Sequence, residues 1–207
     1  MTEIQLRFTC NMPGSIKKSF LKEFSTKLCR SLTARSSGAG QHCTPSLSTK
    51  IAEMATLGIS TNTRLLGLAI INQGRLVEYK VHLHKSSWSP SKANMIVTSL
   101  EPCVRQYSIK KIVLSIPHEH HQTPAFKTLI FCIQEYCKTK GIPVIMEPAE
   151  ALYSFCQNGQ KKTKKAMMYS LVQKFPELRH CYQKELRNKN KYYFKLFEAV
   201  VMAMLHH

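Results

Sequence analysis

Residues 57–71 read LGISTNTRLLGLAII, which is two apolar runs joined by a polar turn. Both runs are short and rich in leucine and isoleucine, a pattern typical of buried strands rather than of amphipathic helices. Asn72-Gln73-Gly74 then has the composition of a tight turn, and a third strand-like run follows at residues 76–83. The stretch therefore predicts a meander of three antiparallel strands at the start of the folded domain.

The rest of the chain alternates helical and strand-like segments. Strands are predicted at residues 111–116 and 143–146. Helices are predicted at residues 89–107, 124–140, 148–156, 161–175 and 192–205, and the charged stretch 177–191 is expected to be an excursion. This order predicts an α/β fold with a five-stranded mixed sheet, three strands antiparallel and then two parallel, flanked by helices on both faces.

The charge of the chain is far from balanced. Its 207 residues include 30 Lys and Arg against 12 acidic residues, a formal charge of +18, and all twelve acids are glutamate. Such an excess predicts a polyanionic partner, nucleic acid first and an anionic membrane surface second. A basic protein without a polyanionic partner is the alternative.

The lengths of the apolar runs and the spacing of the cysteines indicate where in the cell the protein is expected. No apolar run reaches the roughly 20 residues of a membrane span, and none resembles the apolar region of a signal peptide. The eight cysteines include no C-x-x-C pair, so their spacing offers no zinc-ribbon site and favours buried thiols in a reducing compartment. We therefore expect no membrane association and a place inside the cell, in the cytoplasm or on the nucleoid.

Residues 1–53 differ in composition from the remainder, being basic and rich in serine, threonine and glycine. Three interpretations stay open for this extension: a flexible nucleic-acid-binding arm, an organellar presequence, and sequence upstream of the true start. The folded domain is expected to span residues 54–207. These residues hold 22 Lys and Arg against 9 Glu, which is +13, so the basic character belongs to the domain as well.

Five motifs resemble a known family. Residues 57–64 and the following Gly67-Leu68-Ala69-Ile70 are similar to the first hairpin of RuvC-like Holliday-junction resolvases, which reads L-G-I-D-P-G-T-R and then G-x-A-I. Residues 112–116 and 143–148 resemble the fourth and fifth strands of that family. Residues 158–165 resemble its glycine-and-lysine segment that approaches DNA, and residues 195–203 resemble its closing helix, D-x-x-D-A-L-A-x-A. The resemblance covers residues 54–207 and implies a ribonuclease H-like fold, with a homodimer as a plausible assembly.

The resemblance also implies a chemistry that the residues depart from. Enzymes of this fold cut phosphodiesters with two divalent cations about 4 Å apart, held by four carboxylates. The first-strand aspartate corresponds here to Ser60, the strand-four glutamate to Pro117, and the two helix acids to Lys195 and Glu198. Only Glu198 keeps a carboxylate, so the resemblance predicts a degenerate catalytic site without a bound metal, and no cofactor is expected.

Neighbouring residues offer a second interpretation. Glu119 lies two residues after Pro117, and Glu147 and Glu150 follow the predicted fifth strand. An active nuclease would use Glu119 and Glu198 with Mg²⁺ or Mn²⁺, with His118 or His120 as further candidates. The histidine-rich segment 118–121 could instead be a polar loop, and Glu198 could be a helix acid that pairs with Lys195.

A cluster of lysines predicts the nucleic-acid contact. Lys161, Lys162, Lys164 and Lys165 begin a helix whose N-terminal N–H groups are free to meet phosphate, and Arg64 in the first turn is a further candidate. Lysine rather than arginine predominates, which favours backbone contact over base recognition. A solvated lysine face is the plain alternative.

Three hypotheses follow for the function. The first is an inactive RuvC-like domain that binds nucleic acid, preferably DNA, through the basic helix. The second is an active metal-dependent structure-specific endonuclease. The third is a protein–protein interaction module built on the same fold.

Overall fold

The computed structural model describes residues 55–156, 162–189 and 191–207, so the predicted extension 1–53 and Lys161 lie outside the described residues. Five strands form one sheet in the order β3-β2-β1-β4-β5. They are β1 (Ala55–Thr61), β2 (Leu65–Asn72), β3 (Arg75–Leu83), β4 (Ile109–Ile116) and β5 (Val144–Pro148). β1, β2 and β3 pair antiparallel, whereas β4 runs parallel to β1 and β5 runs parallel to β4. The fold class predicted from the sequence is confirmed.

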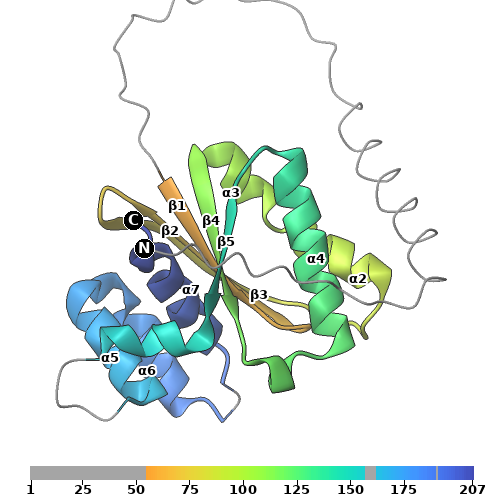
Figure 1. Ribbon diagram of the computed structural model, residues 1–207. Helices are drawn as coiled ribbons and strands as arrows, with labels where there is room; N and C mark the ends of the chain where they lie inside the picture. The colour runs from red at the N-terminus through yellow and green to blue at the C-terminus, as the bar shows by residue number, and fades with distance from the viewer. Residues whose placement is uncertain (1–54, 157–161, 190) are drawn as a thin grey trace, which may run out of the picture. The chain divides into compact units, whose positions relative to one another are not determined.

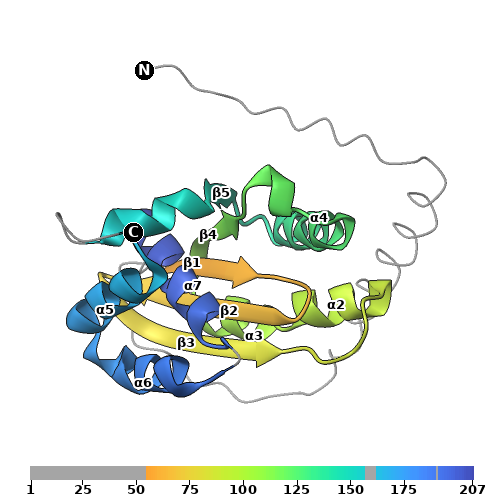
Figure 2. The same cartoon turned by 90° about the horizontal axis from the view of Figure 1, so that it is seen from below.

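Helices cover both faces of this sheet. The α-helices are α2 (Pro90–Thr98), α3 (Glu101–Gln106), α4 (Pro124–Thr139), α5 (Lys164–Lys174), α6 (Arg179–Arg187) and α7 (Phe194–Leu205). Three short 3₁₀ helices complete the described elements: η1 (Glu119–His121), η2 (Ala149–Phe155) and η3 (Pro176–Leu178). Figures 1 and 2 show α5, α6 and α7 on one side of the sheet and α2, α3 and α4 on the other. Among the described residues, no helix is long and apolar enough to cross a bilayer.

Several helix boundaries differ from the sequence prediction. The helix expected over residues 89–107 is two helices, because the chain turns at Ser99 and Leu100 and Pro102 starts a new helix without an N–H to donate. The segment expected at residues 148–156 is the 3₁₀ helix η2. The last correction is larger. The charged stretch expected to be an excursion forms η3 and α6, which are anchored by the buried Leu178 and Cys181.

Two predicted helix ends are confirmed in detail. The Ser89 side chain accepts a hydrogen bond from the backbone N–H of Lys92 at 3.1 Å and so caps α2. After α4, Gly141 has a φ of +66°, a conformation in which a side chain would be strained. The N–H of the next residue, Ile142, donates to the carbonyl of Cys137 at 3.0 Å and closes the helix.

The central helix α7 lies directly against the backbone of the sheet. Its residues 196–203 are all buried, as expected for a helix that is apolar on nearly every side. A Cβ atom added to Gly58 of β1 would lie 1.9 Å from the carbonyl oxygen of Ala199, and one added to Gly67 of β2 would lie 2.1 Å from that of Lys195. These two glycines therefore set how closely α7 approaches β1 and β2.

We predict that Gly58→Ala lowers the free energy of unfolding by about 3 kcal/mol or more, because the methyl group would displace the helix backbone. Gly74→Ala is the matched control. No atom lies within 4 Å of a Cβ at Gly74, and only its positive φ of +73° opposes the change, at about 1 kcal/mol. Urea denaturation of the two variants measures both effects, and equal losses would contradict the close approach of α7.

Candidate functional site

The carboxyl ends of three neighbouring strands place polar side chains in one row. Ser60 of β1 pairs with Ser115 of β4, and Ser115 pairs with Glu147 of β5. Residues paired across adjacent strands project from the same face of a sheet. All three side chains therefore lie on the face that α7 covers, the face on which Gly58, two residues before Ser60, meets Ala199. This row is the base of the candidate site.

Helix α7 adds a cation and a carboxylate above the row. The Ser60 hydroxyl donates a hydrogen bond to Oε2 of Glu198. The Lys195 ammonium donates to the same oxygen at 2.5 Å and to the Ser60 hydroxyl at 3.2 Å. Ser60 is fully buried and Glu198 is only 6% exposed. The three residues form one closed contact, which we call the Ser60–Lys195–Glu198 triad.

The spacing along α7 explains why these two side chains meet. Residues i and i+3 project from the same side of an α-helix, so Lys195 and Glu198 are neighbours. Gly67, which pairs with Ser60 in the sheet, lies directly under the backbone of Lys195. Because α7 approaches the sheet so closely at this glycine, the side chains of Lys195 and Glu198 both reach Ser60.

A histidine–glutamate contact continues the row at β5. Nε2 of His206, which follows the last residue of α7, lies 2.6 Å from Oε1 of Glu147. Both side chains are partly exposed. Glu147 is thus in contact with the end of α7, and it lies within β5 rather than after it as the sequence suggested.

Glu119 is not part of the triad. It lies in η1, beyond the end of β4, where it and the three histidines 118, 120 and 121 are exposed. The rings of His118 and His120 stack with their centroids 5.0 Å apart. Within the described part of the chain, no group of three or more His, Cys, Asp or Glu side chains is placed so that it could hold a metal ion.

The residue of β4 that lies beside Ser60 is Ser115. The resemblance aligns the strand-four glutamate of the resolvases with Pro117, two residues further along the chain. Pro117 lies past the end of β4 and so belongs to no strand. Only the parallel register between β1 and β4 identifies Ser115 as the neighbour.

The turn between β1 and β2 is closed by an asparagine. Oδ1 of Asn62 accepts hydrogen bonds from the backbone N–H groups of Arg64 at 2.8 Å and of Leu65 at 2.7 Å. Asparagine side chains commonly close turns through such side-chain to backbone bonds. Arg64 is exposed at the tip of the turn.

The sequence by itself matches no family model and no curated protein. Its structure is similar to RuvC of Thermus thermophilus in complex with a Holliday junction substrate, with a TM-score of 0.56 and 14% identity over 74% of this chain and 92% of that one. A second Thermus thermophilus RuvC structure gives a TM-score of 0.55 and 12% identity over the same shares. The chain has the ribonuclease H-like fold of RuvC.

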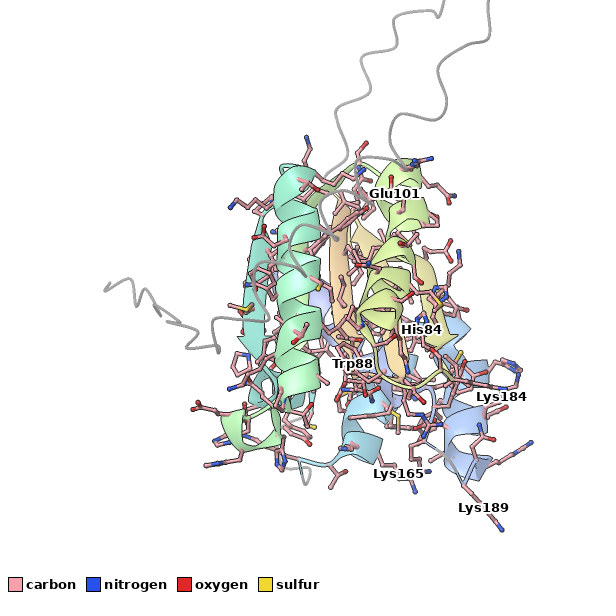
Figure 3. All side chains as sticks on the ribbon, turned by 90° about the vertical axis from the view of Figure 1, so that its right-hand side faces the viewer. His84, Trp88, Glu101, Lys165, Lys184 and Lys189 are labelled. Carbon is pink, nitrogen blue, oxygen red and sulfur yellow. The ribbon has the colours of Figure 1, made fainter. Side chains whose placement is uncertain are left out.

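Basic side chains gather at the end of this RuvC-like fold where β1, β4 and β5 terminate. Figure 3 shows Lys165, Lys184 and Lys189 at that end, on and after α5 and α6. The exposed basic residues of this surface, which we call the α5–α6 surface, are Lys162, Lys164, Lys165, Lys174, Arg179, Lys184, Arg187, Lys189 and Lys191. Its acids among the described residues are Glu177, which is exposed, and Glu185, which is 1% exposed.

Two contacts fix parts of this surface. Thr163 caps α5 by accepting a hydrogen bond from the N–H of Ala166 at 3.1 Å, so the helix starts three residues later than the sequence predicted. The Lys164 ammonium lies 4.4 Å from the centre of the Phe194 ring, a cation–π contact between α5 and α7. The Glu185 side chain is buried and accepts hydrogen bonds from the backbone N–H groups of Tyr192 and Tyr193 at 2.9 and 2.7 Å. Among the described residues it forms no ion pair with a basic side chain of this surface.

The triad gives a prediction on stability. Lys195→Met leaves the buried Glu198 carboxylate without its cation and should lower the free energy of unfolding by about 3 kcal/mol. Lys195→Met combined with Glu198→Leu should recover most of that loss, because no unpaired charge remains. Urea denaturation at neutral pH measures these differences.

Lys80→Met is the matched control for that series. Lys80 pairs with Glu78 at 3.3 Å, but its side chain is 48% exposed, so the loss should stay below about 1 kcal/mol. Equal losses in the two Lys→Met variants would show that the triad does not behave as a buried ion pair.

Proposed function

We propose that this chain is a RuvC-like domain that binds nucleic acid, preferably duplex or branched DNA, and does not cut it. The observation that carries the proposal is the ion pair between Lys195 and Glu198, whose ammonium nitrogen and carboxylate oxygen lie 2.5 Å apart. The family resemblance aligns both residues with carboxylates that bind metal ions in the resolvases. A positive charge is already held there by the protein itself.

The residues of the triad do not fit two divalent cations. Mg²⁺ binds through anionic oxygen ligands, and a two-metal site needs several carboxylates to balance its charge. Ser60 offers a neutral hydroxyl, Lys195 offers a cation that would repel a metal, and the one carboxylate already receives two hydrogen bonds. Glu147, the next acid along the row, is paired with His206. The side chains of this row therefore do not fit a two-metal site.

The α5–α6 surface supports the binding part of the proposal. It presents lysine and arginine side chains from two helices and the segments beside them, and Lys165, Lys184 and Lys189 lie at the end of the fold where β1, β4 and β5 terminate. Contact with phosphate requires only positive charge at suitable spacing, so this surface would recognise the shape and charge of a nucleic-acid backbone rather than its sequence. The Thermus thermophilus protein of the same fold is complexed with a Holliday junction, which makes a four-way junction the first probe.

We predict that Lys165→Ala combined with Lys184→Ala weakens binding of a four-way DNA junction on the order of tenfold at physiological salt. The number of counterions released on binding should fall by about two, so that the affinity depends less steeply on salt concentration. Lys110→Ala combined with Lys138→Ala is the matched control. It removes the same charge from two exposed lysines, one at the start of β4 and one in the last turn of α4. Fluorescence anisotropy across a salt series measures both quantities.

Two outcomes of that titration would contradict the proposed surface. Equal weakening by both double variants would mean that net charge alone drives binding. Tight binding of a partner protein together with no measurable DNA binding would favour the interaction-module hypothesis.

We predict that the full chain leaves a labelled four-way junction intact in Mg²⁺ and in Mn²⁺, because the triad cannot hold the cations that cleavage needs. Gel electrophoresis of the labelled strands measures this. Glu198→Gln and Glu177→Gln should both give the same result as the unaltered chain. Cleavage that disappears only with Glu198→Gln would instead establish the metal-dependent endonuclease.

A further inference from the structure

A second group of basic side chains lies where three elements meet: the β1–β2 turn, the end of β3 and the start of α2. Its members are Arg64, His82, His84 and Lys92, and we call it the Arg64–Lys92 cluster. The backbone N–H of His84 donates to the carbonyl of Arg64 at 2.7 Å, which joins the turn to the end of β3. The rings of His82 and His84 stack with centroids 6.3 Å apart. These contacts hold the basic groups close together.

Lys92 is a buried cation without an acidic partner. It is only 2% exposed, and its ammonium donates to the backbone carbonyl of Ser86. Among the described residues, no carboxylate forms an ion pair with Lys92 or with Arg64. Burial lowers the pKa of Lys92, and the nearby Arg64 guanidinium lowers it further. An anion beside Lys92 would supply the counter-charge that the described part of the chain does not.

His84 leaves a polar atom unused in the same place. Its side chain is 9% exposed, and its Nε2 is buried with no hydrogen-bond partner in the part of the chain that the structure describes. Buried polar atoms are nearly always paired, so an unpaired one beside unpaired cations points to a missing ligand. Helix α2, of nine residues, also begins here and carries no acid in its first turn. Pro90 has no N–H, and the N–H of Lys92 is bonded to Ser89. The start of this helix therefore adds only the N–H of Ser91 to the cluster.

We propose that the Arg64–Lys92 cluster binds a phosphate group, with Arg64 contacting it from solvent and Lys92 and His84 completing its coordination from below. The anion supplies the counter-charge that Lys92 lacks. If the proposed function holds, the ligand is a backbone phosphate of the bound nucleic acid, and this part of the inference rests on it. A phosphate contact at the β1–β2 turn would then add to those of the α5–α6 surface and fix the orientation of the nucleic acid.

The chain contains its own reporter for this cluster. Trp88 is the only tryptophan, and it lies in the loop between His84 and α2. Figure 3 shows Trp88 and His84 near the start of that helix. Its fluorescence should change when an anion enters the cluster.

The test is a titration of the full chain with inorganic phosphate at constant ionic strength, with chloride as the compensating anion. We predict a saturable change in Trp88 fluorescence and a rise in melting temperature, because a ligand of the folded state stabilises it. Arg64→Ala and Lys92→Met should lose both responses. Lys92→Met should also melt no lower than the unaltered chain in the absence of phosphate, since it removes a buried unpaired charge.

Arg75→Ala is the matched control, because Arg75 is the exposed arginine of the other hairpin turn, between β2 and β3. It should keep both responses. The phosphate site would be overturned if the unaltered chain gave no response to phosphate. It would also be overturned if Arg64→Ala and Lys92→Met responded as strongly as the unaltered chain.

A DNA arm separates this inference from the proposed function. Arg64→Ala and Lys92→Met should each weaken binding of the four-way junction by roughly tenfold at physiological salt. The double variant at Lys165 and Lys184 should weaken DNA binding but keep the response to inorganic phosphate. If phosphate binds and DNA does not, the site stands with a small phosphorylated ligand and the proposed function fails. If DNA binds and neither variant at the cluster has an effect, the inference fails and the proposed function stands.

Discussion

The close contact between the backbone of α7 and two glycines of the sheet is the constraint on which the rest of the site depends. Gly58 and Gly67 leave room for the helix carbonyls of Ala199 and Lys195. Any side chain at either position would lift the helix away from β1 and β2. Because α7 lies this low, Lys195 and Glu198 reach the buried Ser60, and the end of the helix brings His206 to Glu147.

The same contact decides how charge is balanced at the carboxyl ends of the strands. Metal-dependent enzymes balance clustered carboxylates with bound cations. Here one carboxylate is balanced by one lysine from the preceding turn of the same helix. An ion pair inside the protein is present in every folded molecule and needs no ligand from solution. We therefore interpret the triad as a structural contact that holds α7 on the sheet.

Positive charge that is left without acidic partners lies elsewhere on the described part of the chain. The α5–α6 surface is exposed, so its lysines are hydrated and cost little while free. The Arg64–Lys92 cluster differs because Lys92 and His84 are buried. In the proposed phosphate site, each contact with an anion would therefore contribute more than a contact on the α5–α6 surface, which offers more contacts. A nucleic-acid backbone that reaches both would combine orientation from the cluster with affinity from the surface.

The sequence by itself determined the sheet and the position of Ser60 in it, because strand length, turn residues and apolar runs are local properties. The resemblance of its motifs to RuvC-like resolvases further predicts that one carboxylate is left where those enzymes have four, and this stays a prediction. Only the tertiary structure decided that Ser115 is level with Ser60, because strand register follows from pairing between distant segments. It likewise revealed that the charged stretch after α5 forms α6, since the few buried side chains of α6 find their partners only in the folded domain. The Arg64–Lys92 cluster joins residues from three elements, and the burial of Lys92 and His84 without an acidic partner could not be read from a chain that is basic throughout.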